Sequence, residues 1–141
     1  MIVGVIGSGG REHAICESLR RSKKTEKIFC FPGNGGTSKI AENININIDN
    51  FEILKDFVLT NKIELIIVGP EKPLVNGIVD FFENNNIKIF GPSKIASQLE
   101  GSKIFTKKLC EKYKIPTAAF GVFKNIDDAE QFLKKKNFQL L

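Results

Sequence analysis

The sequence predicts an α/β fold, a doubly wound and mostly parallel sheet, followed by the beginning of an incomplete second domain. Short apolar runs alternate with amphipathic stretches through the first hundred residues, which is the pattern of strands joined by crossover helices. Several apolar runs stop at glycine or proline, as strands do where a loop begins. This rhythm changes near Gly101, so we expect one domain over residues 1–100 and a linker helix with the start of another over residues 101–141.

The N-terminal elements are predicted from their apolar spacing. Residues 2–6 (IVGVI) and 27–31 (KIFCF) are short apolar runs, typical of strands buried on both faces. Between them, residues 12–22 carry an apolar stripe and end in two arginines, which favours a helix because cations stabilise a helix C-terminus. Three isoleucines alternate with polar residues over 44–48, which indicates a half-exposed edge strand or an extended segment.

The same alternation of strands and helices continues through the rest of the first domain. Along the chain we expect a helix over 51–61, a strand over 63–68, a helix over roughly 74–84, a strand over 87–90 and a short helix starting near Ser93. Asp49 or Asn50 can cap the first of these helices, because both side chains accept hydrogen bonds from unpaired amides of a first turn.

Different elements are expected after Gly101. Residues 102–113 form an amphipathic pattern that predicts a helix, and residues 118–123 (AAFGVF) predict a strand outside the rhythm of the first sheet. A further helix follows Asp127, and residues 138–141 (FQLL) predict a strand that runs into the end of the sequence.

Composition narrows the class of protein. The chain has 141 residues, 42% of them hydrophobic and 26% charged, which is typical of a globular domain with a real core. It has neither a run long enough to span a membrane nor a basic flank followed by a cleavable apolar segment, so we expect a cytoplasmic protein without a membrane partner. Three scattered cysteines and one histidine predict reduced, structural thiols rather than a zinc site or a disulfide framework.

The net charge of +5 does not by itself indicate nucleic-acid binding. The lysines are dispersed, and the absence of Trp, with a single Tyr, leaves only phenylalanines to stack on bases. Most of those phenylalanines occur at core-like spacings. An enzyme with anionic substrates explains the charge equally well, so we expect no nucleic-acid partner.

The motif GSGGREH, residues 7–13, is a glycine turn directly behind the first strand. A dinucleotide fingerprint requires a third glycine, where this chain has Glu12, and an acidic residue after the second strand, where it has Pro32, Gly33 and Asn34. Since a carboxylate in the first helical turn repels a second phosphate, these two departures argue against a nicotinamide cofactor.

A narrower phosphate site remains. The backbone N–H groups of Gly9, Gly10 and Arg11 are expected to point outward at a helix N-terminus, which favours a single phosphate, and Arg11 can add a charged contact. Glu12 only accepts hydrogen bonds and so suits hydroxyls or an amine. The alternative is a tight strand-to-helix turn whose polar residues are merely solvated.

Three other loops share this character. These loops cover residues 31–37, 68–74 and 90–93, and each follows a predicted strand. The C-terminal ends of parallel strands meet at one edge of the sheet, which is where ligands bind in open α/β folds. The loop of residues 31–37 supplies Asn34 and Thr37, and the loop of residues 68–74 supplies Glu71 between two prolines that stiffen it. Amide, hydroxyl and carboxylate groups around a phosphate cradle predict a sugar phosphate as ligand.

Five motifs carry a family resemblance that covers essentially the whole chain. In order, they are GSGGREHA, PGNGGT, IIVGPEKPLVNGIVD, IFGPS and QLEGSKIFTKKL followed by KIPTA. In this order and spacing they resemble the N-terminal part of the phosphoribosylamine–glycine ligase (glycinamide ribonucleotide synthetase) family of purine biosynthesis, within the ATP-grasp superfamily. The resemblance implies that the first domain is a Rossmann-like, pre-ATP-grasp domain.

The resemblance also implies an activity. Members of the family are ATP-dependent carbon–nitrogen ligases that join 5-phosphoribosylamine to glycine through a glycyl phosphate, with Mg²⁺ or Mn²⁺ beside the ATP. It implies sugar-phosphate contacts at the following positions: Gly9, Gly10, Arg11, Glu12, Asn34, Gly36, Thr37, Pro70 and Glu71. Lys103, in the GSK sequence, matches the superfamily lysine that reaches the ATP phosphates; by sequence alone, a solvated lysine at a helix start is the alternative.

The chain departs from the family pattern in one respect. Family members continue into an ATP-grasp domain that carries the metal-binding carboxylates and most of the nucleotide pocket, whereas this sequence stops at Leu141. We therefore expect a fragment that is inactive alone, with no catalytic or metal-binding residue of its own. A non-catalytic sugar-phosphate or nucleotide-binding module and a nicotinamide-dependent oxidoreductase remain the competing hypotheses.

Overall fold

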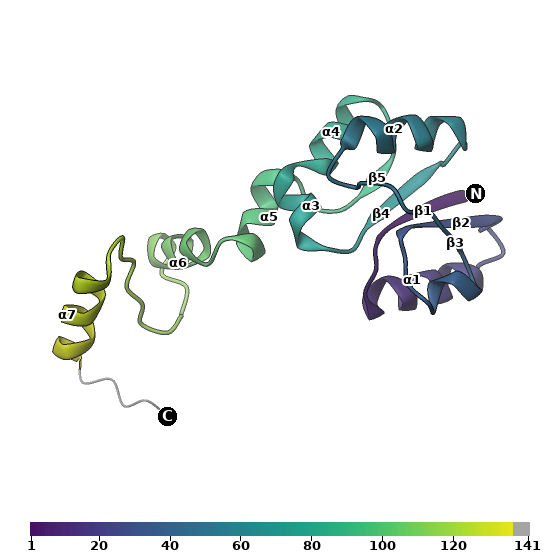
Figure 1. Cartoon of the computed structure of the whole chain (residues 1–141). Coiled ribbons are helices and arrows are strands. Elements are labelled where there is room, and N and C mark those ends of the chain that lie inside the picture. Colours follow the sequence, from purple (N-terminus) through teal and green to yellow (C-terminus); the bar gives the residue numbers. More distant parts are fainter. Residues whose placement is uncertain (137–141) are drawn as a thin grey trace. The chain divides into compact units, whose positions relative to one another are not determined.

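The computed structural model describes residues 1–136 (Figure 1). The elements up to Gly101 are β1 (Ile2–Gly7), α1 (Gly10–Arg20), β2 (Lys27–Pro32), the 3₁₀ turn η1 (Thr37–Lys39), β3 (Glu42–Asn43), α2 (Phe51–Thr60), β4 (Leu65–Val68), α3 (Glu71–Asn76), α4 (Ile78–Asn84), β5 (Ile89–Phe90) and α5 (Lys94–Gly101). Two helices follow, α6 (Lys103–Lys112) and α7 (Ile126–Lys136). The chain divides after Gly101 into two compact units.

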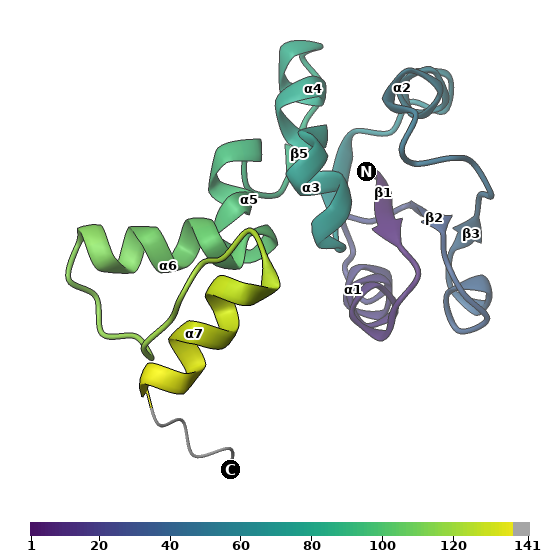
Figure 2. The same ribbon diagram turned by 60° about the vertical axis from the view of Figure 1, so that its left-hand side comes forward.

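The first unit contains a five-stranded sheet in the order β3-β2-β1-β4-β5. Every neighbouring pair is parallel, so the prediction of a doubly wound, mostly parallel sheet is confirmed, with no antiparallel pair among the described strands. Figure 2 shows α1 and α2 on opposite sides of the strands. Since each crossover returns the chain to the same edge, the loops after the strands lie together.

Side chains alternate between the two faces of the sheet, as a period of two requires. In β2, Phe29 and Phe31 are buried with residues of α2 and α4, whereas Ile28 and Cys30 are buried with Cys16 of α1. Phe57 of α2 meets the rings of Phe29 and Phe31 edge-on, with ring centroids 5.4 Å apart in both pairs. Edge-to-face contacts of this kind stabilise a core beyond the area that they bury.

The edge of the sheet differs from the expectation at residues 44–48. The edge strand β3 is two residues long and pairs Glu42 with Phe29 and Asn43 with Cys30. Residues 44–48 form no strand, so the edge-strand alternative is wrong over these residues. The alternation has a different cause, because Ile44, Ile46 and Ile48 pack in turn against the larger core cluster.

The single helix expected over 74–84 is two helices. Gly77 ends α3 in the left-handed conformation, with a φ of 93°, and α4 begins at the next residue. A residue with a Cβ atom rarely adopts this conformation, so glycine at this position divides the segment. Asp80, in the first turn of α4, accepts a hydrogen bond from the backbone N–H of Lys94 at 2.7 Å and so links α4 to the start of α5.

The second unit contributes two helices to the described residues. Ser102 caps α6, since its Oγ accepts a hydrogen bond from the backbone N–H of Phe105 at 3.2 Å. The strand expected over 118–123 is not formed. The described residues after Ser102 include no strand with which this segment could pair. The strand expected over 138–141 lies outside the described residues. Across residues 1–136, none of the helices is both long and apolar enough to cross a membrane.

Candidate functional site at the carboxyl edge of the sheet

The loops predicted to bind a ligand follow the carboxyl ends of adjacent strands. Gly7, at the end of β1, pairs with Pro32 of β2, and Ile6 pairs with Val68 of β4. The direction of winding reverses between β1 and β4, because β2 lies on one side of β1 and β4 on the other. A reversal of this kind opens a crevice at the carboxyl edge, which is where ligands bind in open α/β sheets.

A cavity of about 370 Å³ occupies this position. It is lined by Gly7, Ser8, Gly9, Glu12, Pro32, Ile48, Asp49, Pro70, Lys72 and Pro73. Of the predicted site residues, Gly9, Glu12 and Pro70 therefore share one cavity. Its volume falls in the usual range for small-molecule sites, and its lining combines apolar groups with a few polar ones.

Glu12 faces into the protein. Its side chain is 4% exposed, and its Oε2 accepts a hydrogen bond from the backbone N–H of Gly9 at 2.6 Å. The carboxylate lies so close to Gly69, at the end of β4, that a Cβ atom there would collide with it. The expectation that Gly9 offers its amide outward is therefore wrong, because the side chain three residues ahead folds back and takes that hydrogen bond.

The amides of Gly10 and Arg11 open helix α1. Amides in a first turn have no acceptor within their own helix, and together with the helix dipole they favour an anion. These two groups, rather than three, form the amide part of the predicted phosphate cradle.

Arg11 links the glycine turn, residues 7–13, to the third loop of this edge, residues 68–74. Its Nε lies 3.2 Å from Oε1 of Glu12, and its Nη2 lies 3.4 Å from Oε1 of Glu71. The hydrogen bond to Glu12 is the main cause that raises the pKa of Arg11, so the guanidinium stays charged. The pKa of Glu71 is lowered, first by a hydrogen bond from its own backbone amide and then by the charge of Arg11, against some desolvation.

The second loop, residues 31–37, uses its three predicted site residues mainly for contacts within the protein. Thr37 is fully buried, and Asn34 donates through Nδ2 to the carbonyl oxygens of Ser8 and Gly9, at 2.9 and 3.2 Å. Gly36 donates its N–H to Oδ1 of Asn34 at 2.7 Å. This loop is thus held against the glycine turn, and Asn34, Gly36 and Thr37 do not line the cavity.

His13 packs locally. Its ring lies where a Cβ atom on Gly36 would approach within 2.5 Å, so the two residues pack closely. Within residues 1–136, the His13 imidazole belongs to no group of three or more His, Cys, Asp and Glu side chains that could hold a metal ion.

Sequence reasoning missed a charged pair at the cavity. Asp49, which was considered only as a helix cap, and Lys72 both line the cavity, and Lys72 Nζ lies 2.6 Å from Asp49 Oδ2. Lys72 stands between the two prolines of the third loop, in a segment already singled out for Glu71. Only the fold brings it to Asp49, 23 residues earlier, so no local pattern could have revealed the pair.

Lys103 is the first residue of α6, in the second unit, and its side chain is exposed. Its contact with ATP stays a prediction. In the described part of the chain, no group of three or more His, Cys, Asp and Glu side chains could hold a metal ion. Residues 1–136 therefore do not fit a Mg²⁺ or Mn²⁺ site.

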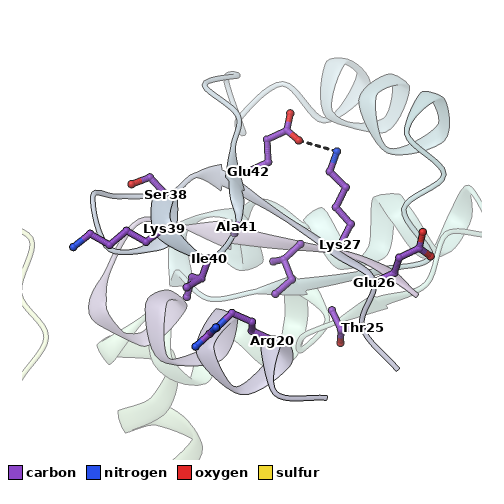
Figure 3. Close-up of a pocket in the computed structure, with 10 residues that line it drawn as sticks. Arg20, Thr25, Glu26, Lys27, Ser38, Lys39, Ile40, Ala41 and Glu42 are labelled. Atoms are coloured by element: carbon purple, nitrogen blue, oxygen red, sulfur yellow. Dashed lines mark ion pairs between the residues drawn. The ribbon is translucent and has the colours of Figure 1, made fainter. Parts of the chain in front are cut away.

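A second depression, of about 490 Å³, lies where α1 ends and β2 begins (Figure 3). Arg20 and Lys39 flank it, and Lys27 Nζ lies 2.7 Å from Glu42 Oε2. It includes none of the predicted site residues and stands away from the carboxyl ends of the strands. Its charges are mixed, and one lysine is already paired, so we assign it no ligand.

Comparison with known proteins supports the expectation drawn from the motifs. Residues 1–100 match the family model described as phosphoribosylglycinamide synthetase, N domain. A phosphoribosylamine–glycine ligase of Caldanaerobacter subterraneus subsp. tengcongensis is 53% identical over 135 residues, which are 96% of this chain and 32% of the relative. The ligase of Clostridium acetobutylicum is 45% identical over 141 residues, the whole of this chain and 34% of the relative.

Solved structures agree. The crystal structure of a Thermotoga maritima phosphoribosylamine–glycine ligase has a TM-score of 0.68 at 29% identity, and the match covers 96% of this chain and 30% of that one. An N5-carboxyaminoimidazole ribonucleotide synthetase from the same organism reaches a TM-score of 0.70 at 18% identity, which shows a shared fold alone. The chain spans about a third of the length of the curated relatives that it matches. It belongs to the phosphoribosylglycinamide synthetase family, and its first 100 residues match the N domain of that family.

Proposed function

We propose that this chain supplies the sugar-phosphate-binding part of an ATP-dependent ligase that joins 5-phosphoribosylamine to glycine. The observation that carries the proposal is the opening of α1 beside the cavity at the point where the winding of the sheet reverses. There the amides of Gly10 and Arg11 and the guanidinium of Arg11 together favour a phosphate.

The polar groups of the cavity suit the remainder of a sugar phosphate. Asp49 accepts hydrogen bonds and Lys72 donates them, and both line the cavity beside the apolar surfaces of Ile48 and Pro73. A ribose needs both kinds of partner for its hydroxyls, since each hydroxyl both donates and accepts. We propose that Arg11 faces the phosphate and that the Asp49–Lys72 pair faces the sugar.

The proposed reaction has two steps. ATP phosphorylates the glycine carboxylate and gives glycyl phosphate and ADP. The amine of 5-phosphoribosylamine then attacks the carbonyl carbon, forms the amide bond of glycinamide ribonucleotide, and releases phosphate and a proton. We derive no step through a metal ion, since the residues described form no site for one. In this proposal the first unit holds the amine substrate, and its chemistry is binding and orientation.

Four further parts of the assignment belong to this proposal. They are the contact of Lys103 with ATP, the use of Mg²⁺ or Mn²⁺ beside that nucleotide, action in the cytoplasm, and the reading of residues 101–141 as a linker helix and the start of an ATP-grasp domain. The match to relatives about three times as long supports the last of these. Glycine and ATP are the other proposed substrates, and neither a nucleic acid nor a membrane is a proposed partner.

Calorimetric titration of the 141-residue chain with four compounds tests the proposal. We expect ribose 5-phosphate to bind, ribose to bind more weakly, and ATP and NADH not to bind tightly. We expect Arg11→Ala to weaken ribose 5-phosphate binding and to leave the weaker affinity for ribose nearly unchanged. Tight NADH binding, or equal affinity for ribose and ribose 5-phosphate, would overturn the proposal. Phosphate release that depends on both ATP and glycine would overturn the expectation that these 141 residues are inactive alone.

A further inference from the structure

Asn43 has no role in the proposed site, yet its side chain is half-buried and both ends of its amide are engaged. It lies in the edge strand β3 and donates through Nδ2 to the carbonyl oxygen of Asn34 at 2.9 Å. Its Oδ1 accepts a hydrogen bond from the hydroxyl of Thr37 at 2.8 Å. Asn43 therefore holds the second loop through two hydrogen bonds without lining the cavity itself.

The second loop is in turn joined to the glycine turn through the side chain of Asn34. Oδ1 of Asn34 accepts the backbone N–H groups of Gly36 and Thr37, at 2.7 and 3.0 Å. Since its oxygen is committed in this way, its NH₂ group must face the opposite direction, where it donates to the carbonyls of Ser8 and Gly9. Asn34 is thus a bridge between two loops, with all of its side-chain groups in use.

The hold on the Gly9 carbonyl sets the direction of a group at the phosphate cradle. That carbonyl and the N–H of Gly10 belong to one peptide unit, and in a planar trans peptide the two bonds point in opposite directions. The carbonyl is held twice, by Nδ2 of Asn34 and by the backbone N–H of His13, each at 3.2 Å, and the Gly10 N–H therefore points away from the second loop. A donor whose direction is fixed before binding costs less to bring onto the ligand than one that must first be ordered.

We propose that Asn43 is a positioning residue for phosphate binding, acting through Thr37 and Asn34 on the orientation of the Gly9–Gly10 peptide. This inference rests on the proposed function, since it concerns the same cradle. Asn43 itself touches no ligand. Its loss is expected to loosen the second loop and to weaken the hydrogen bond from Asn34 to the Gly9 carbonyl, so that the His13 N–H alone holds the direction of the Gly9–Gly10 peptide.

The test compares Asn43→Ala with Asn85→Ala in the 141-residue chain, at a temperature where circular dichroism shows each variant to be folded. Asn85 is a matched control, because its Nδ2 also donates to a backbone carbonyl, that of Phe81 at 2.8 Å, but at the end of α4. We expect Asn43→Ala to raise the Kd for ribose 5-phosphate about tenfold, equivalent to about 1.4 kcal/mol, and Asn85→Ala to leave it within about twofold.

A purely structural role for Asn43 would lower the melting temperature and leave the Kd of the folded protein unchanged, and that result would overturn the inference. If Asn43→Ala does not fold, Thr37→Val replaces it, since valine keeps the shape of the side chain and removes only the hydroxyl that joins Asn43 to Asn34. Thr37→Ser, which keeps the hydroxyl, should recover most of the affinity that valine loses. Failure of the unaltered chain to bind ribose 5-phosphate would remove the proposed function itself and this inference with it.

Discussion

The carboxylate of Glu12 lies 2.6 Å from the backbone nitrogen of Gly9 and closes the glycine turn from inside the protein. Glu12 occupies the position of the third glycine in a dinucleotide fingerprint, where close packing of helix and strand is needed. Here the side chain fills the space between the ends of β1 and β4, and Gly69 provides the room for it. The same residue that argues against a nicotinamide cofactor thus holds the turn in shape.

The first prediction concerns Glu12→Gln. Glutamine keeps the size of the side chain, but it loses the charge that faces Arg11 and places an NH₂ group where an acceptor is needed. A buried group without a proper partner costs about 1–3 kcal/mol, and we expect that loss in the free energy of unfolding, measured by urea denaturation. Glu17→Gln, on the same helix but 32% exposed, should change it by less than about 0.5 kcal/mol. Equal effects of the two changes would contradict the role given to Glu12.

The second prediction concerns pH. Folding depresses the pKa of Glu71, so this carboxylate contributes stability at neutral pH, and the contribution is lost as the pH falls through the depressed pKa. We expect Arg11→Ala to raise the pKa of Glu71 toward the ordinary value of about 4.3 without reaching it, because the backbone amide of Glu71 remains. Titration of the side-chain carboxyl carbon by NMR measures this shift. A pKa that does not move in Arg11→Ala would show that the ion pair is not formed in solution.

The third prediction concerns the start of α2. Oδ1 of Asn50 accepts the backbone N–H of Ile53 at 3.2 Å, which makes Asn50, of the two candidates in the sequence, the capping residue. Asn50→Ala should lower the free energy of unfolding by about 1 kcal/mol, and Asn50→Asp should retain most of it. The measurement is again urea denaturation, and an Asn50→Asp variant as unstable as Asn50→Ala would argue against the cap.

The fourth prediction concerns the break between α3 and α4. Gly77 has a φ of 93°, and a side chain in the left-handed region costs about 1–2 kcal/mol, so Gly77→Ala should destabilise the protein by that amount. Gly35→Ala is the control, because a Cβ atom there meets nothing within 4 Å and its φ is not positive. If thermal denaturation gave the two variants the same stability, the break would not depend on glycine.

The sheet and the edge where the loops gather could be predicted from the sequence, because apolar runs that end in glycine or proline are local signals. The length of β3 could not be predicted from the sequence. The alternation of Ile44, Ile46 and Ile48 indicates burial on one side, but it does not indicate whether a partner strand lies alongside. The prediction of a strand over 118–123 was wrong for the same reason, because the hydrogen-bond partners of a strand come from distant parts of a chain.

The candidate site shows a similar limit. Its glycine turn, Arg11 and Glu71 were identified from residue types at the ends of strands, and the structure brings the two side chains within 3.4 Å. The direction of Glu12 was not predictable, because a carboxylate in a first turn serves equally well as a ligand contact or as a cap. Asn43 carried no local signal at all, since its partners are in a loop that only the fold brings beside it.

The proposed sugar-phosphate site is tested most directly by titration of the ¹⁵N-labelled chain with ribose 5-phosphate, followed by NMR of the backbone amides. If the phosphate binds at the start of α1, the amide resonances of Gly10 and Arg11 should shift most, with smaller changes at Asp49 and Lys72. A phosphate site at the start of α1 is contradicted if the resonances of Gly10 and Arg11 do not shift while the largest shifts fall on Arg20 and Lys39, beside the depression at the other end of α1.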